Sequence, residues 1–256
     1  MSHLSFPAYE YLAYPPAQPI GRQLRQLTSE VQEAALLLVN VYGLCLAPTS
    51  SARKKMMALF GAREVARREQ IAQDCLTPAA RHARQIGMPV IYAADSAPRI
   101  DLGKSRFGEI QRDHLGYDPE TAFAENCNDP HEYQAGTSGL IEYAPEIAPQ
   151  GDDYYIRKWV YSAFYLTWLD RLLRNLGTKT LFCAGFNGDS DLWCTMLEGQ
   201  WLGYRILLLS DGFAAVDIPA AEPVMPFTQR LAHYAENCLG YTCTSAHFVE
   251  ACKEVR

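Results

Sequence analysis

The sequence predicts an α/β fold with three layers (αβα), in which helices cover both faces of a six-stranded, mainly parallel sheet. Short apolar runs of strand length alternate with longer amphipathic runs along most of the chain. The run 34–42, AALLLVNVY, is almost entirely apolar, as is typical of a parallel strand buried on both faces. A glycine-rich turn at 185–191 follows another apolar run, which is how open α/β sheets place their chemistry.

The alternation defines the elements in chain order. We expect strands at 34–42, 88–93, 154–158, 180–185, 204–210 and 241–245. We expect helices at 64–85, 162–176, 189–202, 226–238 and the C-terminal residues. Ser190 is the expected N-cap of the helix at 189–202. A helix between two neighbouring parallel strands gives the right-handed βαβ connection.

The length of 256 residues and a hydrophobic content of 48% fit one large domain, at 31–256. Residues 1–30 hold four prolines and are expected to form an extended arm over the body or a neighbouring subunit, with a partly disordered tail as the alternative. The irregular segment 95–150 is a long insertion. A long loop in a compact domain is usually functional or disordered, so we expect a cover over the site or a subunit contact.

Charge and composition exclude several classes of function. A net charge of −6 without a strong basic patch disfavours nucleic acid as a partner. No apolar run is long enough to span a bilayer, and the N-terminus lacks a secretory pattern, so we expect a cytoplasmic protein that does not bind membranes. Eight cysteines without a C-x-x-C pair indicate reduced, mostly buried thiols. His114 and His131 lack metal-ligand spacing, so we expect neither a metal nor another cofactor.

Polar residues at the carboxyl ends of the expected strands are the candidate site residues, because ligands bind there in open parallel sheets. Asn40 lies near the end of the first strand, although an asparagine there could simply close a turn. Lys158 ends the third strand. Asn187 and Gly188 lie in the turn before Asp191, where they could supply donors to a substrate.

Aromatic residues after Lys158 are candidates for the wall of a substrate pocket. Trp159, Tyr161 and Phe164 follow the lysine closely. Packing in the core is at least as good an explanation for each of them.

The run KWVYSAF at 158–164, with Thr195 and the Gly203-Tyr204 pair, resembles the isochorismatase-like (cysteine hydrolase) superfamily. The resemblance is continuous from about 145 to 211. It implies a six-stranded parallel sheet, a homodimer or homotetramer, and hydrolysis of a small-molecule substrate. In the amidohydrolases of this superfamily, an aspartate ends the first strand, a lysine ends the third, and a cysteine nucleophile begins the helix after the fourth. A cis peptide often shapes the turn before that helix.

The chain departs from this pattern at two of the three positions. The first-strand aspartate corresponds to Asn40, and the lysine is kept as Lys158. The nucleophile of the family lies four residues before a threonine and twelve before the glycine of a Gly-Tyr pair. Counting back from Thr195 (195 − 4) and from Gly203 (203 − 12) gives Asp191 both times. Cys194 comes three residues later, where a side chain is better placed for packing than for catalysis.

Three functions fit these residues. The first is hydrolysis of a C–N amide or ureide bond or a C–O vinyl-ether bond without cysteine, with Asp191 and Lys158 at the centre and Asn40 as a neutral partner. In it Asp191 acts as an acid or base on water, or attacks the substrate itself. The second is a catalytically silent homologue that binds a metabolite or a protein partner. The third is an interaction protein that acts through residues 1–30 and 95–150.

Overall fold

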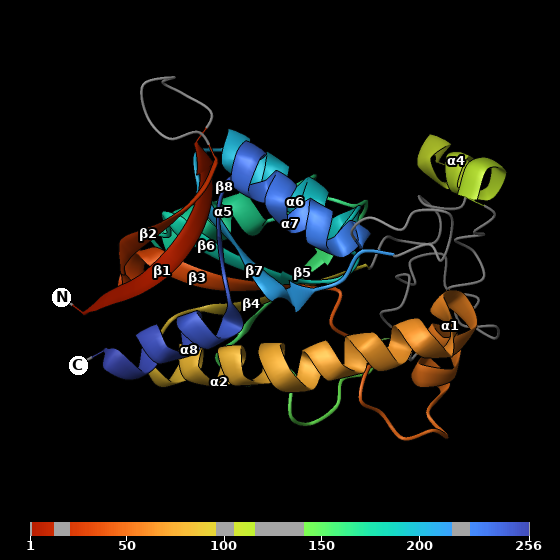
Figure 1. Ribbon diagram of the computed structural model, residues 1–256. Helices are drawn as coiled ribbons and strands as arrows, with labels where there is room; N and C mark the ends of the chain where they lie inside the picture. The colour runs from red at the N-terminus through yellow and green to blue at the C-terminus, as the bar shows by residue number, and fades with distance from the viewer. Residues whose placement is uncertain (1, 13–20, 96–104, 116–140, 217–225, 256) are drawn as a thin grey trace.

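The computed structural model describes residues 2–12, 21–95, 105–115, 141–216 and 226–255. Its centre is a mixed sheet of eight strands in the order β2-β1-β8-β7-β6-β3-β4-β5 (Figure 1). Six of these strands run parallel: β3 (Ala34–Val39), β4 (Val90–Asp95), β5 (Tyr154–Lys158), β6 (Thr180–Gly185), β7 (Arg205–Phe213) and β8 (Gly240–Cys243). The α/β class is confirmed, and the expected count of six strands is two too low.

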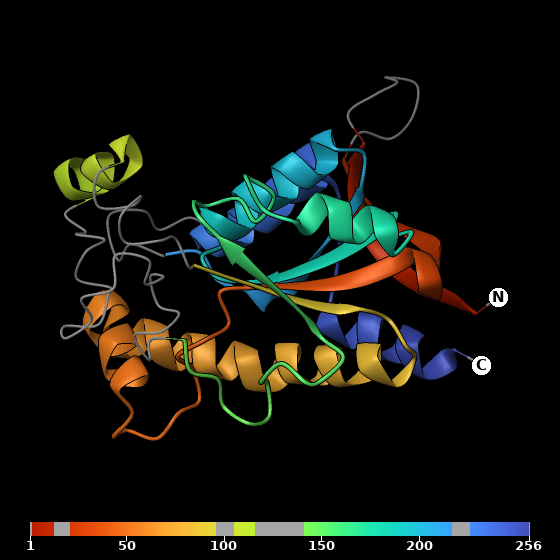
Figure 2. The ribbon, with the colours of Figure 1, turned by 180° about the vertical axis from the view of Figure 1, so that it is seen from behind.

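The two further strands come from the N-terminal segment that was expected to be an extended arm. β1 (His3–Leu12) and β2 (Gly21–Glu30) pair antiparallel along their whole lengths, and β1 joins β8 through Tyr9 and Thr242. The hairpin therefore adds an antiparallel edge to the parallel sheet, at the opposite edge from β5 (Figure 2).

Contacts from both strands hold this hairpin against the body. Alternate side chains of β1 are buried, as on one face of a strand: Leu4, Phe6 and Ala8. From β2, Arg22 donates two hydrogen bonds to the buried Glu236 carboxylate, at 2.8 and 2.9 Å. A bidentate pair of this kind fixes geometry as well as charge, so it anchors the hairpin to the helix that carries Glu236.

Helices cover both faces of the sheet (Figures 1 and 2). One face carries α1 (Ser51–Ile71), α2 (Thr77–Gln85) and α8 (Ser245–Glu254). The other carries α5 (Leu169–Asn175), α6 (Asp191–Trp201) and α7 (Phe227–Cys238). Successive residues of β3 divide between the two cores: Leu36 and Leu38 join one hydrophobic cluster, while Leu37 and Val39 join the other. A strand buried on both faces must be apolar throughout, and the residues of β3 are all apolar.

Two helices differ from their expected bounds for local reasons. α1 begins at Ser51 because the Ser50 hydroxyl accepts the Arg53 amide hydrogen at 3.2 Å, and a π-helical turn (Ala72–Leu76) joins it to α2. The helix expected at 162–176 begins only at Leu169. The amide of Ala163 donates to the Thr195 hydroxyl instead, at 2.9 Å, and this tie keeps the preceding segment irregular.

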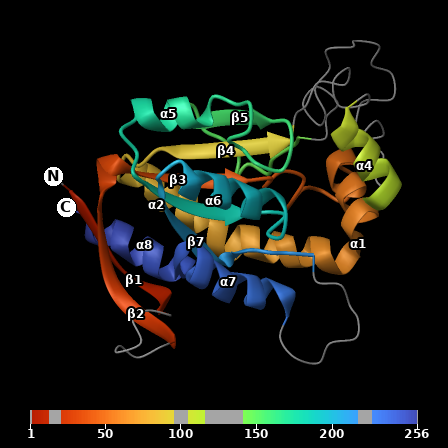
Figure 3. The ribbon, with the colours of Figure 1, turned by 90° about the horizontal axis from the view of Figure 1, so that it is seen from above.

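The parallel strands all end at one edge of the molecule. In Figure 3 the arrow of β4 points to the end where the start of α1 and the helix α4 (Arg106–Leu115) lie. Most of the expected insertion at 95–150 lies outside the described residues, the exceptions being Asp95, 105–115 and 141–150. No described helix has the length and apolarity needed to cross a membrane. The described cysteines, which exclude Cys127, are all free thiols.

Candidate active site

Lys158, the last residue of β5, is the centre of a buried cluster of charged and polar side chains. Its side chain has no exposure to solvent, and its ammonium contacts a carboxylate oxygen of Asp95 and one of Asp191. It also donates to the carbonyl of Val160 at 3.3 Å. A buried ammonium is costly unless it is paired, so the two carboxylates are what permit a lysine at this place.

Asp191 occupies the first position of α6, directly after the turn that follows β6. One carboxylate oxygen contacts Lys158, and the other accepts from the Asn187 amide at 3.0 Å and from the Ser190 hydroxyl at 3.1 Å. Ser190 is the N-cap residue of α6, as expected, but its hydroxyl donates to the Asp191 side chain and does not accept from the helix backbone. The Phe186–Asn187 peptide before Asp191 is cis, as the resemblance implied.

Asp95 ends β4 and completes the cluster from the other side. It is the Cα partner of Lys158 in the parallel ladder of β4 and β5. One of its oxygens contacts Lys158, and the other accepts from the Asn40 amide at 2.9 Å and from the Tyr42 hydroxyl at 3.2 Å. Asp95 was not among the residues predicted for the site, although its place at the end of an apolar strand is the same signal that pointed to Asn40.

The charges of the cluster shift one another. Burial opposes the positive charge of Lys158, but the carboxylates of Asp191 and Asp95 outweigh it, so the pKa of Lys158 is raised. Burial raises the pKa of Asp95, and the Asp191 charge adds to that rise although the Lys158 ammonium opposes it. The lysine therefore stays charged at neutral pH, and Asp95 holds a proton more readily than an ordinary aspartate.

Asn40 contacts the cluster through its side-chain amide nitrogen only. Its nitrogen donates to Asp95, which fixes the orientation of the group because a carboxylate accepts but does not donate. Its oxygen is buried and has no hydrogen-bond partner among the described residues. Such a buried acceptor costs about 1–3 kcal/mol unless a donor reaches it. A bound molecule or water is the natural source of that donor.

Arg68 lies behind the cluster and was not among the residues predicted for the site. The side chain is buried and donates to the side-chain amide oxygen (Oδ1) of Asn187 at 2.8 Å and to the Glu64 carboxylate at 3.0 Å. Burial lowers the pKa of Arg68, and Glu64 opposes that change. With its oxygen held by Arg68, the Asn187 amide presents its nitrogen to Asp191.

The other candidate residues lie at different distances from the cluster. The Gly188 amide donates to Ala214 at 2.7 Å and is therefore engaged within the fold. Trp159 and Tyr161 are half-buried beside Lys158 in the chain, and Tyr161 meets Phe107 of α4 edge-on at 5.3 Å.

Phe164 is buried and stacks on Tyr204 at 5.8 Å. It also packs closely against Gly199, which lies eight residues beyond Asp191 on α6. Eight residues of helix span about 12 Å. Phe164 is thus part of the packing along the helix, away from the charged cluster.

Cys194 lies inside α6, about one turn from Asp191. Burial raises the pKa of its thiol, and the Asp191 charge raises it further although Lys158 opposes this. Reactive cysteines are typically those whose pKa is lowered, and the surroundings of Cys194 shift its pKa in the opposite direction. Among the described residues, His, Cys, Asp and Glu side chains form no group of three suited to a metal ion.

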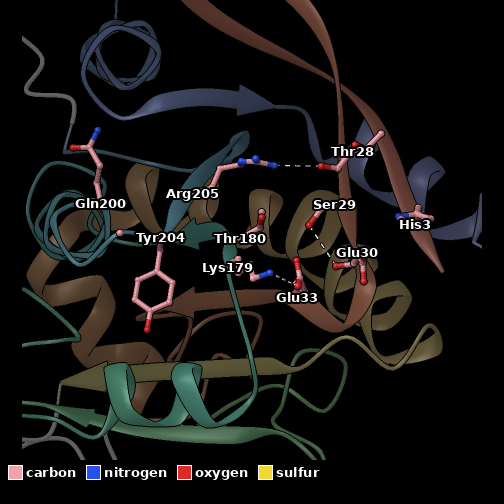
Figure 4. A pocket seen from close by; sticks show the side chains of 11 residues that line it. His3, Thr28, Ser29, Glu30, Glu33, Lys179, Thr180, Gln200, Tyr204 and Arg205 are labelled. Carbon is pink, nitrogen blue, oxygen red and sulfur yellow. Dashed lines mark hydrogen bonds and ion pairs between the residues drawn. The ribbon is translucent and has the colours of Figure 1, made fainter. Parts of the chain in front are cut away.

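Two cavities lie in other parts of the described structure. One, of about 650 Å³, is lined by residues of β2 and of the starts of β6 and β7 (Figure 4). It lies at the amino ends of the parallel strands, opposite Lys158. The other, of about 380 Å³, lies between the turn after β3 and the segment before β5, and includes Cys45 and Ile147. Neither cavity is lined by the buried cluster.

The family of the chain follows from comparison with known proteins. A sequence model described as the isochorismatase domain matches residues 59–242. The chain belongs to the isochorismatase family. Members of this family are generally hydrolases. A curated relative, the uncharacterized isochorismatase family protein YwoC of Bacillus subtilis (strain 168), is 30% identical over 86 residues, which are 34% of this chain and 46% of that protein. The match thus spans about half the length of that relative.

Solved structures show the same fold for this isochorismatase-family protein. A cysteine hydrolase from Pseudomonas syringae pv. phaseolicola 1448A aligns with a TM-score of 0.62 and 20% identity, over 88% of this chain and 94% of its own. N-carbamoylsarcosine amidase from Thermoplasma acidophilum aligns with a TM-score of 0.52 and 21% identity, over 83% of this chain and 96% of its own. At these identities the likeness concerns the fold.

Proposed function

We propose that this isochorismatase-family protein hydrolyses a small metabolite without a cysteine nucleophile, using Asp191 and Lys158. The bond is a C–N amide or ureide bond, or a C–O vinyl-ether bond. The observation that supports this most strongly is the buried contact between Lys158 and Asp191 at the carboxyl ends of parallel strands. Buried charges of this kind concentrate at functional sites, where the fold accepts their cost.

The proposed mechanism follows from the two signs of charge. As water adds to a carbonyl carbon, negative charge develops on the oxygen, and a fixed ammonium in a site shielded from water stabilises that charge. Lys158, whose pKa is raised, provides the ammonium. A carboxylate in contact with Lys158 takes the proton of the attacking water. Asp191 occupies the helix start that holds the thiol in the amidohydrolases, and water takes over the role of that thiol.

The neighbours of the pair have supporting roles in this proposal. Asn187 holds the Asp191 carboxylate in place through its amide. Trp159 and Tyr161 follow Lys158 and line the substrate pocket. Asn40 presents a buried, unpartnered amide oxygen as an acceptor for substrate or water.

The test is turnover of a panel of small amides, ureides and vinyl ethers by the wild-type protein and by Asp191→Asn and Lys158→Ala. We expect hydrolysis of at least one compound, and a loss of at least ~100-fold in each variant, which is the scale of a lost acid, base or charge stabiliser. Wild-type rates in both variants would show that any activity lies elsewhere on the protein.

A catalytically silent binding protein is the second candidate, and one observation favours it. The side chain of Asp191 is only 4% exposed, and three donors within the protein already satisfy it. Such a carboxylate could serve only to stabilise Lys158. This candidate predicts metabolite binding by calorimetry with no turnover of the panel, and a single compound hydrolysed in an Asp191-dependent way would eliminate it.

A further inference from the structure

The two carboxylates that hold Lys158 are alike in their contacts. Each gives one oxygen to the lysine, and each accepts at its second oxygen from one amide and one hydroxyl. For Asp191 those donors are Asn187 and Ser190, and for Asp95 they are Asn40 and Tyr42. The partners alone therefore do not show which carboxylate exchanges a proton with the substrate.

The two carboxylates differ in how far their side chains are exposed to solvent. The side chain of Asp95 is 29% exposed, against 4% for Asp191. A group that exchanges a proton with a bound molecule must be within hydrogen-bond reach of it, or within reach through one water. Asp95 meets this requirement, whereas Asp191 is enclosed by the protein.

The amide of Asn40 provides an independent sign that a ligand binds beside Asp95. The nitrogen of this amide is used by Asp95, and the oxygen is buried without a partner among the described residues. A donor on a bound molecule, or on the attacking water, would satisfy that oxygen. Such a donor would lie next to the Asp95 carboxylate, because the same amide group contacts both. The unpartnered Asn40 oxygen and the partly exposed Asp95 carboxylate thus lie in the same small region.

We propose that Asp95 is the catalytic acid and base of this protein, supplying from β4 the carboxylate that Asn40 does not supply from β3. The inference rests on the proposed hydrolase function. Asp191 is then the fixed counter-charge that holds Lys158 in place, and it does not itself exchange a proton.

For an amide or ureide substrate, the step balances as follows. Asp95 takes one proton from water while the water oxygen forms a bond to the carbonyl carbon and the carbonyl electrons move to the carbonyl oxygen, whose negative charge the field of the buried Lys158 ammonium stabilises. The tetrahedral intermediate then collapses, the C–N bond breaks, and Asp95 returns the proton to the leaving nitrogen. One water is consumed, and a carboxylic or carbamic acid and an amine are formed.

The surroundings of Asp95 suit this role. Burial raises the pKa of the carboxyl group, Asp191 adds to the rise, and Lys158 opposes it. The Tyr42 hydroxyl donates to the carboxylate, and Tyr155 on β5 is the other titratable group that interacts with it. A raised pKa moves a carboxyl group towards neutral pH, which favours a group that must both take and return a proton.

The experiment compares the kinetics of wild type, Asp95→Asn and Asp170→Asn on a substrate found with the panel. Asp170 is a hydrogen-bonded carboxylate on α5, away from the cluster, and serves as the matched control. We expect Asp95→Asn to lose at least ~100-fold in kcat with little change in KM, and to lose the acidic limb of the pH profile. Asp170→Asn should keep the wild-type kcat and the acidic limb of the pH profile.

Two results would overturn the assignment of Asp95. One is a folded Asp95→Asn protein with more than half of the wild-type kcat. The other applies if that variant does not fold, and it uses NMR of the wild-type protein labelled with ¹³C-aspartate. A pKa of Asp95 at or below the ordinary value of 3.8 would then contradict the assignment. Wild-type turnover that survives Asp95→Asn but not Lys158→Ala removes only this inference. No wild-type turnover removes the proposed function, and the inference that rests on it.

Discussion

The two ends of the parallel sheet differ in how they handle charge. At the carboxyl ends, Lys158 is fully buried between two carboxylates. At the amino ends, a cavity of about 650 Å³ is bordered by the ion pair of Lys179 and Glu33, whose side chains are 70% and 33% exposed (Figure 4). The larger of the two cavities described above is thus at the end with ordinary, solvated charges.

The two ends differ in how far water screens their charges: the candidate site carries buried charge, and the cavity at the amino ends carries exposed charge. A solvated ion pair contributes little to stability and little to catalysis because water screens it. A buried cluster is costly to build and strongly coupled, and folds keep such clusters mainly where they have a function. The predictions below test this contrast between the ends.

The largest expected effect is that of Lys158→Met, which keeps the shape of the side chain and removes its charge. The buried Asp191 and the partly exposed Asp95 would then lack their cation, and breaking a buried pair in this way costs about 3–5 kcal/mol. Urea unfolding at pH 7 measures the loss. The cost should shrink at low pH, where Asp95, whose pKa burial raises, takes up a proton. An unchanged unfolding midpoint would mean that water already shields this cluster.

The second effect concerns backbone packing at the two ends. Gly185 ends β6 with φ of +121°, and a Cβ there would lie 2.0 Å from the Val39 carbonyl oxygen. Gly177 precedes β6 with φ of +73°, and a Cβ there would meet no described atom within 4 Å. We expect Gly185→Ala to cost roughly 3 kcal/mol or more and Gly177→Ala roughly 1 kcal/mol. Equal costs, measured by thermal unfolding, would contradict the tighter packing at the site end.

The smallest effect is the pH dependence of stability. The pKa of Lys158 is raised above its ordinary value of 10.5. Its stabilising contribution is therefore complete below pH 10.5 and is lost as the pH rises through the higher folded value. Wild type should lose stability in this alkaline range more steeply than Lys158→Met. The hydrogen bond with Glu33 also raises the pKa of Lys179, but water screens that exposed pair. Lys179→Met should therefore flatten the curve much less than Lys158→Met, and equal flattening would count against the contrast.

Much of the fold could be predicted from the sequence because the parallel strands are buried on both faces. Runs such as 34–42 and 180–185 are apolar without alternation, and glycines mark their ends. The N-terminal hairpin was missed because its prolines indicated an extended arm. Pro7 nevertheless lies within β1, and the alternation of Leu4, Phe6 and Ala8 was the signal that a strand was present.

The candidate site was predictable where it depends on strand ends and on the spacing of the resemblance. Lys158 and Asp191 meet in the structure, and Asn40 lies in the same cluster through Asp95. Asp95 and Arg68 depend instead on tertiary pairing. The contact of Asp95 with Lys158 comes from the register of β4 on β5, and Arg68 reaches Asn187 from 119 residues away. Local sequence carries neither relation.

The central claim is cysteine-independent hydrolysis at the Lys158 cluster, and one pair of rates tests it most directly. The measurement is kcat/KM of Asp191→Asn and of Cys194→Ser, each relative to wild type, on the best substrate of the panel. The predicted result is a loss of at least ~100-fold for Asp191→Asn and a wild-type value for Cys194→Ser. The reverse outcome, with activity lost on removal of the thiol and kept on neutralisation of Asp191, would contradict it.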